Sequence, residues 1–125
     1  MTNENLSPDM AAQILRSHPT EAKRALTTSD GPYKVCLLFS QGVFTLSWSA
    51  GTIGDYDWVA LYSETDSGNN DYVTYQWARN GVFYNTGANV QSGYQARYLV
   101  WDKDTAQYIV VASTQGFPNT QLCSS

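Results

Sequence analysis

The chain has 125 residues, a net charge of −4 and an apolar share of 42%. This length fits one domain, and a charged share of only 14% beside 14% aromatic residues argues against a disordered chain. Only seven basic residues are spread over the chain. Nucleic acid and anionic membranes are therefore unfavourable partners on electrostatic grounds.

The first ten residues are polar and contain no apolar segment of a signal peptide. We expect a cytoplasmic protein without a membrane span, with secretion by a non-classical route as the alternative. Cys36 and Cys123 allow one disulfide at most. The sequence favours two unpaired thiols, one of them buried in a strand. The alternative is a bridge between the tail and the first strand, which would favour an oxidising compartment.

A break in composition divides the chain, because every aromatic residue lies between Tyr33 and Phe117. We therefore predict a helical N-terminal extension over 1–32 and a β-sandwich domain over 33–125. Ser7-Pro8-Asp9 is typical of a helix start, with Ser as N-cap and Pro in the first turn. The predicted helix ends before His18-Pro19, and residues 20–26 favour a second short helix.

From Tyr33 onward, apolar and polar residues alternate with a period of two, and turn residues separate the segments. This pattern predicts strands over 33–39, 43–49, 57–63, 72–78, 82–84, 94–101 and 107–113. Asn80-Gly81 predicts a hairpin within 72–84. Short, regularly spaced strands without crossover helices indicate an all-β fold, an antiparallel immunoglobulin-like β-sandwich behind a short helical leader.

Groups that could carry catalysis are few. His18 is the only histidine, and no His/Cys cluster or glycine-rich phosphate loop is present. Asp55 and Asp57 are spaced like paired carboxylates, but a polar turn before a strand explains them better. The loop at 66–71 offers oxygen ligands for calcium without the order of an EF-hand, and a solvated loop explains these residues better. We therefore expect no enzyme, cofactor or bound metal.

Three segments resemble the SKICH family of immunoglobulin-like domains. Residues 54–62, GDYDWVALY, resemble its DWVGLY/F strand; residues 72–77, YVTYQW, resemble its YYTYxW strand; and residues 93–98, GYQARY, resemble its YQFRY strand. The resemblance covers about residues 43–117 in the same order. It implies a sandwich fold and a role in protein–protein contacts.

A two-sheet sandwich cannot bury all of the aromatic residues, so we expect some of them to form a binding surface. Exposed aromatic rings beside amides are typical of carbohydrate sites. The candidate ligand-binding residues lie in the second half of the domain: Tyr72, Trp77, Arg79, Asn80, Tyr84, Asn85 and Trp101. The leading hypothesis is a small lectin-like protein. The alternative is a SKICH-like protein-interaction module that self-associates, as a homodimer, through its N-terminal helices.

Overall fold

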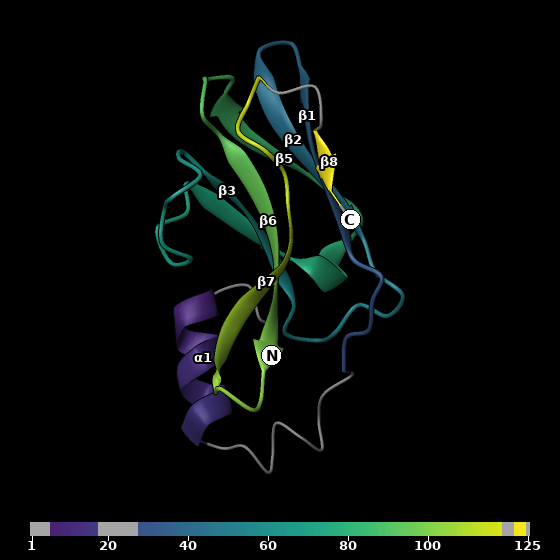
Figure 1. Ribbon diagram of the computed structural model, residues 1–125, viewed down its shortest axis with the longest axis vertical. Helices are drawn as coiled ribbons and strands as arrows, with labels where there is room; N and C mark the ends of the chain where they lie inside the picture. The colour runs from purple at the N-terminus through teal and green to yellow at the C-terminus, as the bar shows by residue number, and fades with distance from the viewer. Residues whose placement is uncertain (1–5, 18–27, 119–121, 125) are drawn as a thin grey trace.

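The structure is a computed structural model that describes residues 6–17, 28–118 and 122–124. It contains one α-helix, one short 3-10 helix and eight strands in these residues (Figure 1). Their bounds are α1 (Pro8–Ser17), β1 (Lys34–Ser40), β2 (Val43–Ser49), β3 (Trp58–Tyr62), β4 (Thr74–Trp77), η1 (Ala78–Asn80), β5 (Phe83–Asn89), β6 (Gln95–Asp102), β7 (Gln107–Ser113) and β8 (Cys123–Ser124).

The strands form two four-stranded antiparallel sheets. The first sheet has the order β5-β2-β1-β8 and the second has the order β4-β3-β6-β7. This arrangement confirms the predicted mainly β fold with a helix near the N-terminus. The β1–β2 hairpin turns where the sequence predicts it, and its two turn residues Gln41 and Gly42 have φ angles of 53° and 80°. The positive φ explains why glycine suits the second of these positions.

The hairpin predicted at Asn80-Gly81 is wrong. Residues 78–82 instead carry the chain from β4 in the second sheet to β5 in the first. The physical reason lies in Trp48 of β2, whose indole Nε1 donates a 3.0 Å hydrogen bond to the carbonyl of Ala78. The backbone N–H of Trp48 also donates to the carbonyl of Val82 at 3.0 Å. Both bonds draw the chain toward the first sheet, where β5 runs further than the predicted strand.

The main core lies between the two sheets. Its members are every second residue along the strands of both sheets. They include Phe44, Leu46 and Trp48 from β2, which face Val59 and Leu61 from β3. These side chains are at most 2% exposed. The two-residue period of the sequence therefore predicts which residues of each strand share a side, but it does not predict which side of β3 faces this core.

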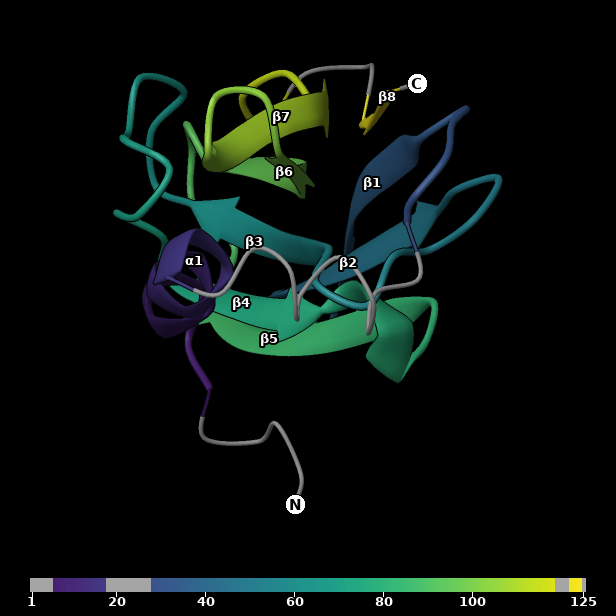
Figure 2. The same cartoon turned by 90° about the horizontal axis from the view of Figure 1, so that it is seen from below.

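A second, smaller core lies on the outer side of the second sheet. Figure 2 shows α1 against β3 and β4, on the side away from β1 and β2. As a result β3 is buried on both of its faces, with all five residues inaccessible. The helix starts as predicted, because Ser7 accepts hydrogen bonds from the N–H of Met10 and of Ala11. Residues 20–26, predicted as a second helix, and His18 lie outside the described residues.

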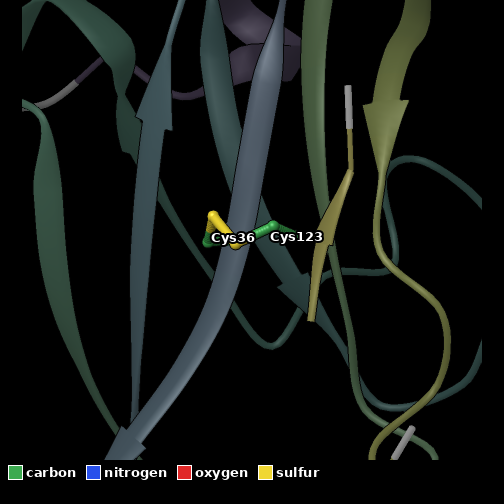
Figure 3. Close-up of a disulfide and its surroundings, with 2 residues drawn as sticks. All are labelled: Cys36 and Cys123. Atoms are coloured by element: carbon green, nitrogen blue, oxygen red, sulfur yellow. A yellow bond between two sulfur atoms is a disulfide. The ribbon is translucent and has the colours of Figure 1, made fainter. Parts of the chain in front are cut away.

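A disulfide joins Cys36 of β1 to Cys123 of β8, which are direct partners in the ladder (Figure 3). The interpretation of the two cysteines as unpaired thiols is therefore wrong, and the bridge that ties the tail to the first strand is present. No helix in the described part of the chain is long and apolar enough to cross a membrane.

Candidate functional site

The outer side of the second sheet carries an unusual concentration of aromatic rings, which we call the aromatic face. It consists of Trp58, Tyr72, Tyr75, Trp77, Trp101 and Tyr108. The rings meet edge to face: Trp58 lies 5.6 Å from Tyr72 and 5.5 Å from Tyr108, measured between ring centroids. Such contacts stabilise aromatic pairs by about 0.5–1.5 kcal/mol each beyond their burial. The rings of the aromatic face are therefore packed against one another.

The strand register explains how these rings come together. Trp77 of β4 is the direct partner of Trp58 of β3, and Trp101 of β6 is the direct partner of Tyr108 of β7. Directly paired residues point to the same side of an antiparallel sheet. Four strands distant in sequence thus bring their rings to one surface.

The helix α1 packs against this face through Ala11. Ala11 is fully buried, while Ala12 and Leu15 are 6% and 2% exposed. The small alanine methyl groups let the helix backbone come close to the rings beneath it. On its opposite side α1 exposes Met10 and Ile14, which are 49% and 43% accessible and lie one helical turn apart. One apolar side of the helix is thus buried, and the other apolar side is exposed to solvent.

Polar contacts fix both ends of α1. At its start, the carbonyl of Leu6 accepts hydrogen bonds from the Tyr75 hydroxyl at 3.1 Å and from the Trp77 Nε1 at 3.0 Å. At its end, Arg16 donates from Nε to the carbonyl of Ala106 at 2.9 Å, and its guanidinium lies 5.7 Å from the ring centroid of Trp101. These contacts set the position of the helix along the face.

Among the described residues, one buried side-chain polar atom has no hydrogen-bond partner. The indole Nε1 of Trp58 is buried and makes no hydrogen bond, although the residue is completely inaccessible. An unsatisfied buried donor costs about 1–3 kcal/mol. The second core therefore contains one unpaired hydrogen-bond donor.

A buried arginine shapes the neighbouring end of the same sheet. Arg97 is 6% exposed, and its guanidinium lies 3.9 Å from the ring centroid of Tyr62. It donates to the side-chain oxygens of Gln95 and Asn69, both at 2.8 Å, and to the carbonyl of Thr65 at 3.0 Å. Burial raises the pKa of Tyr62, and the nearby charge of Arg97 opposes this shift. Arg97 therefore anchors the acidic loop that follows β3 to the sheet.

A second buried polar group supports β3 from the inner side. The carboxylate of Asp57 accepts 2.8 Å hydrogen bonds from the N–H of Gly54 and from the hydroxyl of Tyr98. A Cβ at Gly54 would lie 2.8 Å from Oδ1 of Asp57, so glycine is required for this close approach. Burial raises the pKa of Asp57, partly offset by these donors. The Asp-Tyr-Asp-Trp segment thus positions Trp58 at the start of the strand.

The structure separates the seven predicted ligand-binding residues into three places. Tyr72, Trp77 and Trp101 lie on the aromatic face, where Trp77 is only 4% exposed because α1 covers it. Tyr84 and Asn85 belong to β5 of the other sheet.

The other two predicted residues, Arg79 and Asn80, lie in the exposed η1 turn. The side-chain Nδ2 of Asn80 donates a 2.8 Å hydrogen bond to Oε1 of Gln76, and a 3.0 Å hydrogen bond joins the hydroxyls of Tyr84 and Thr74. The residues do not form one site, and their role in sugar binding stays a prediction.

The candidate calcium loop at 66–71 serves a structural purpose. The backbone carbonyl of Asn69 accepts a 2.7 Å hydrogen bond from the Tyr62 hydroxyl, and its side chain binds Arg97. In residues 6–17, 28–118 and 122–124, no group of three or more His, Cys, Asp or Glu residues could hold a metal ion.

The residues that sequence reasoning missed are those of the helix that covers the face. Ala11, Leu15 and Arg16 were expected only as part of a helical leader. The available signal was the spacing of Ala11 and Leu15, four residues apart on one helix face. Alanine gives little hydrophobic contrast, so the spacing indicates a buried helix side without indicating its partner.

No curated protein and no solved structure matches the chain. The family model of the SKICH domain matches residues 43–116, which confirms the predicted resemblance and its extent. The matched segment begins at β2 and ends after β7, so it includes the aromatic face and excludes α1. Since the match covers more than half of the 125 residues, the chain belongs to the SKICH family.

Proposed function

We propose that this chain is a non-enzymatic protein-interaction module that uses its aromatic face to bind an amphipathic helix. The observation that carries the proposal is α1 itself, a helix outside the family-matched segment that lies on the aromatic face of that segment. Membership of the SKICH family supports a protein partner. Carbohydrate binding gains no comparable support, because the predicted residues are dispersed and Trp77 is covered.

The helix depends on the face for its structure. It has ten residues, fewer than the roughly 12–15 at which isolated helices become marginally stable in water. Two of its buried side chains are alanines, and its polar contacts with the face come from Leu6 and Arg16, so an external helix with the same pattern can compete for the position.

The chemistry of the face defines the partner. It should carry small residues one turn before a leucine, as in Ala11 and Leu15, so that its backbone approaches the rings. A basic residue after the leucine would meet Trp101, as Arg16 does. This is helix-in-groove recognition, in which apolar residues at helical spacing act as anchors.

The experiment measures binding in trans. A fluorescein-labelled peptide of residues 6–17 is titrated with the full-length chain carrying Leu15→Asp, in which α1 no longer fits the face. Fluorescence anisotropy should show saturable binding to this variant and much weaker binding to the wild type, where α1 is in place. Met10→Asp, on the exposed side of α1, is the matched control and should behave like the wild type.

A milder variant guards against loss of the fold. Arg16→Glu removes the contacts with Ala106 and Trp101 without placing a charge in the core, since Arg16 is exposed. It should bind the peptide more tightly than the wild type does. If both variants keep their near-UV circular dichroism and neither binds the peptide, helix recognition by this face is wrong.

The disulfide supports an oxidising compartment as the place of action. Structural disulfides are rare in the cytoplasm, where thiols are kept reduced. The bridge between Cys36 and Cys123 therefore favours the alternative location over the cytoplasmic expectation.

A further inference from the structure

The disulfide lies on the outer side of the first sheet, at the edge of β1. The neighbours of Cys36 in this strand, Val35 and Leu37, are fully buried in the main core. Because successive side chains of a strand point to opposite faces, Cys36 points away from this core. Its partner Cys123 is exposed, and Figure 3 shows the bond between β1 and β8. A thiol in solution therefore reaches the bond from the side of Cys123.

Apart from the disulfide, β8 is held mainly by backbone hydrogen bonds. The strand has two residues and pairs only with β1, at Val35 and Cys36. One further bond runs from the N–H of Leu37 to the carbonyl of Leu122, at 2.6 Å. In the described structure, neither Leu122 nor Cys123 belongs to the two hydrophobic cores. So few backbone bonds do not offset the conformational entropy that a segment loses when it is ordered, and the disulfide is the main attachment of β8.

The strand β1, by contrast, is held in place without β8. On its other edge it pairs with β2 over all seven of its residues and without a register shift. Its inward side chains Val35 and Leu37 also pack in the main core. Loss of β8 would therefore leave β1 in position and make it an edge strand, whose backbone groups at 35–37 are open to solvent or to another strand.

We propose that the bond between Cys36 and Cys123 is a redox switch, which fastens β8 to the edge of β1 when oxidised and releases it when reduced. The reductant is a dithiol. One of its thiolates attacks Sγ of Cys123, the S–S bond breaks, and Cys36 leaves as a thiolate that takes up a proton. The second thiol of the reductant then attacks the mixed disulfide and releases Cys123. The reductant is thereby oxidised to a disulfide, and both cysteines become thiols.

This switch goes beyond the proposed helix recognition, because it acts on the other sheet. The aromatic face and α1 lie on the outer side of the second sheet, whereas β1 and β8 belong to the first. An oxidising compartment keeps β8 fastened, and a compartment rich in reduced thiols releases it. The switch thus controls the availability of the β1 edge and leaves the aromatic face as it is.

The test reduces the full-length chain with dithiothreitol in buffer without denaturant. Alkylation by N-ethylmaleimide and mass spectrometry count the freed thiols, and we expect both cysteines to be alkylated while the near-UV circular dichroism is retained. Amide hydrogen exchange is followed by NMR at Leu37, whose N–H loses its acceptor, and at Ala60 in the buried strand β3.

The two amides should respond differently to reduction. Exchange at Leu37 should accelerate about tenfold or more, at a rate that low concentrations of urea do not change, because the opening is local. Ala60 should remain the slower of the two, and its exchange should accelerate with urea, because it requires unfolding of the whole domain.

Two variants separate the switch from a general effect of substitution. Cys123→Ser lacks the bond, so Leu37 should exchange rapidly before any reductant is added and should not respond to dithiothreitol. Asn89→Ser, at the exposed end of the opposite edge strand β5, is the matched control and should respond as the wild type does. The peptide titration described above should give the same result with and without dithiothreitol, so helix recognition and the switch can fail separately.

Three results would overturn the proposal. If dithiothreitol reduces the bond only after urea has unfolded the chain, the bond is not accessible in the folded state. If the reduced chain protects Leu37 as well as the oxidised chain does, β8 stays on β1 without the bond. If the reduced chain loses its near-UV circular dichroism, the bond holds the whole fold and not β8 alone.

Discussion

The two sheets share one core but have opposite outer faces. The outer side of the first sheet carries Thr45 and Ser47 of β2 beside the disulfide, with Leu38 and Phe83 as separate exposed apolar residues, and no described element covers it. The outer side of the second sheet carries the aromatic face and is covered by α1. Serine and threonine can face water, whereas a contiguous surface of large rings is normally covered or serves as a binding site. The type of residue on the outer side of each sheet thus determines which sheet is covered by a helix.

The largest expected effect on stability comes from removing a ring at the centre of the aromatic face. Trp58→Ala removes the fully buried ring of the aromatic face and should lower the free energy of unfolding by about 3–5 kcal/mol. Phe83→Ala, on the open face where the ring is 66% exposed, should change it by less than about 0.5 kcal/mol. Urea denaturation of both variants measures the difference. Similar losses would show that the two faces contribute alike.

Trp58→Phe is the matched control for the first variant. It keeps an aromatic ring and removes the unpartnered Nε1 donor, so part of the lost packing is offset by the relief of an unsatisfied group. We expect a loss well below that of Trp58→Ala. An equal loss would mean that the indole N–H stabilises the fold through its contacts with the surrounding rings.

An intermediate effect on the free energy of unfolding is expected for a residue on the inner side of the second sheet, away from both outer faces. Asp57→Asn should lower the free energy of unfolding by about 1–3 kcal/mol, because two donors that bind the carboxylate meet an amide instead.

The same variant should change the pH dependence. Burial raises the pKa of Asp57 above its ordinary 3.8, so the folded chain holds the proton more tightly than the unfolded chain does. The stability from this group is fully present below 3.8 and is lost as the pH rises through the folded pKa. Denaturation between about pH 3.5 and 7 should show this decline in the wild type and not in Asp57→Asn. A wild-type advantage that grows with pH would contradict the sign.

The smallest expected effect on stability concerns the edge of the aromatic face, where Arg16 at the end of α1 lies over Trp101. Arg16→Gln removes the cation above Trp101 and weakens the hydrogen bond to Ala106, at a cost of about 0.5–1 kcal/mol. Quenching of tryptophan fluorescence by acrylamide should increase, since Trp101 becomes more accessible. An unchanged quenching constant would show that the other contacts of α1 suffice to shield the ring.

Strands with a clear two-residue period could be predicted from the sequence. β2 alternates Phe44, Leu46 and Trp48 with small polar residues, and its inward side follows directly. β3 was equally well located, but its alternation between Trp58 and Val59 conceals that both sides are buried. An antiparallel strand with an apolar residue on both sides needs cover on both sides, which in this chain comes from α1.

The parts that could not be predicted depend on contacts between distant residues. The switch of the chain between sheets after Trp77 is set by hydrogen bonds to Trp48, some thirty positions earlier. Asn80-Gly81 favours a tight turn in any context, so local propensity predicted a hairpin where tertiary contacts determine a crossover. The same switch places two of the candidate sugar-binding residues, Trp77 of β4 and Tyr84 of β5, in different sheets.

The bond between Cys36 and Cys123 also determines how the molecule would carry a mechanical load. It closes a covalent loop across 87 positions, and this loop contains the whole of the family-matched segment 43–116. A pulling force applied between the two ends of the chain would pass from β1 through the two sulfur atoms to β8. Strands β2 to β7, with the aromatic face, would bear none of the tension along the backbone. A tethered chain could thus be stretched at its termini while the aromatic face kept its shape.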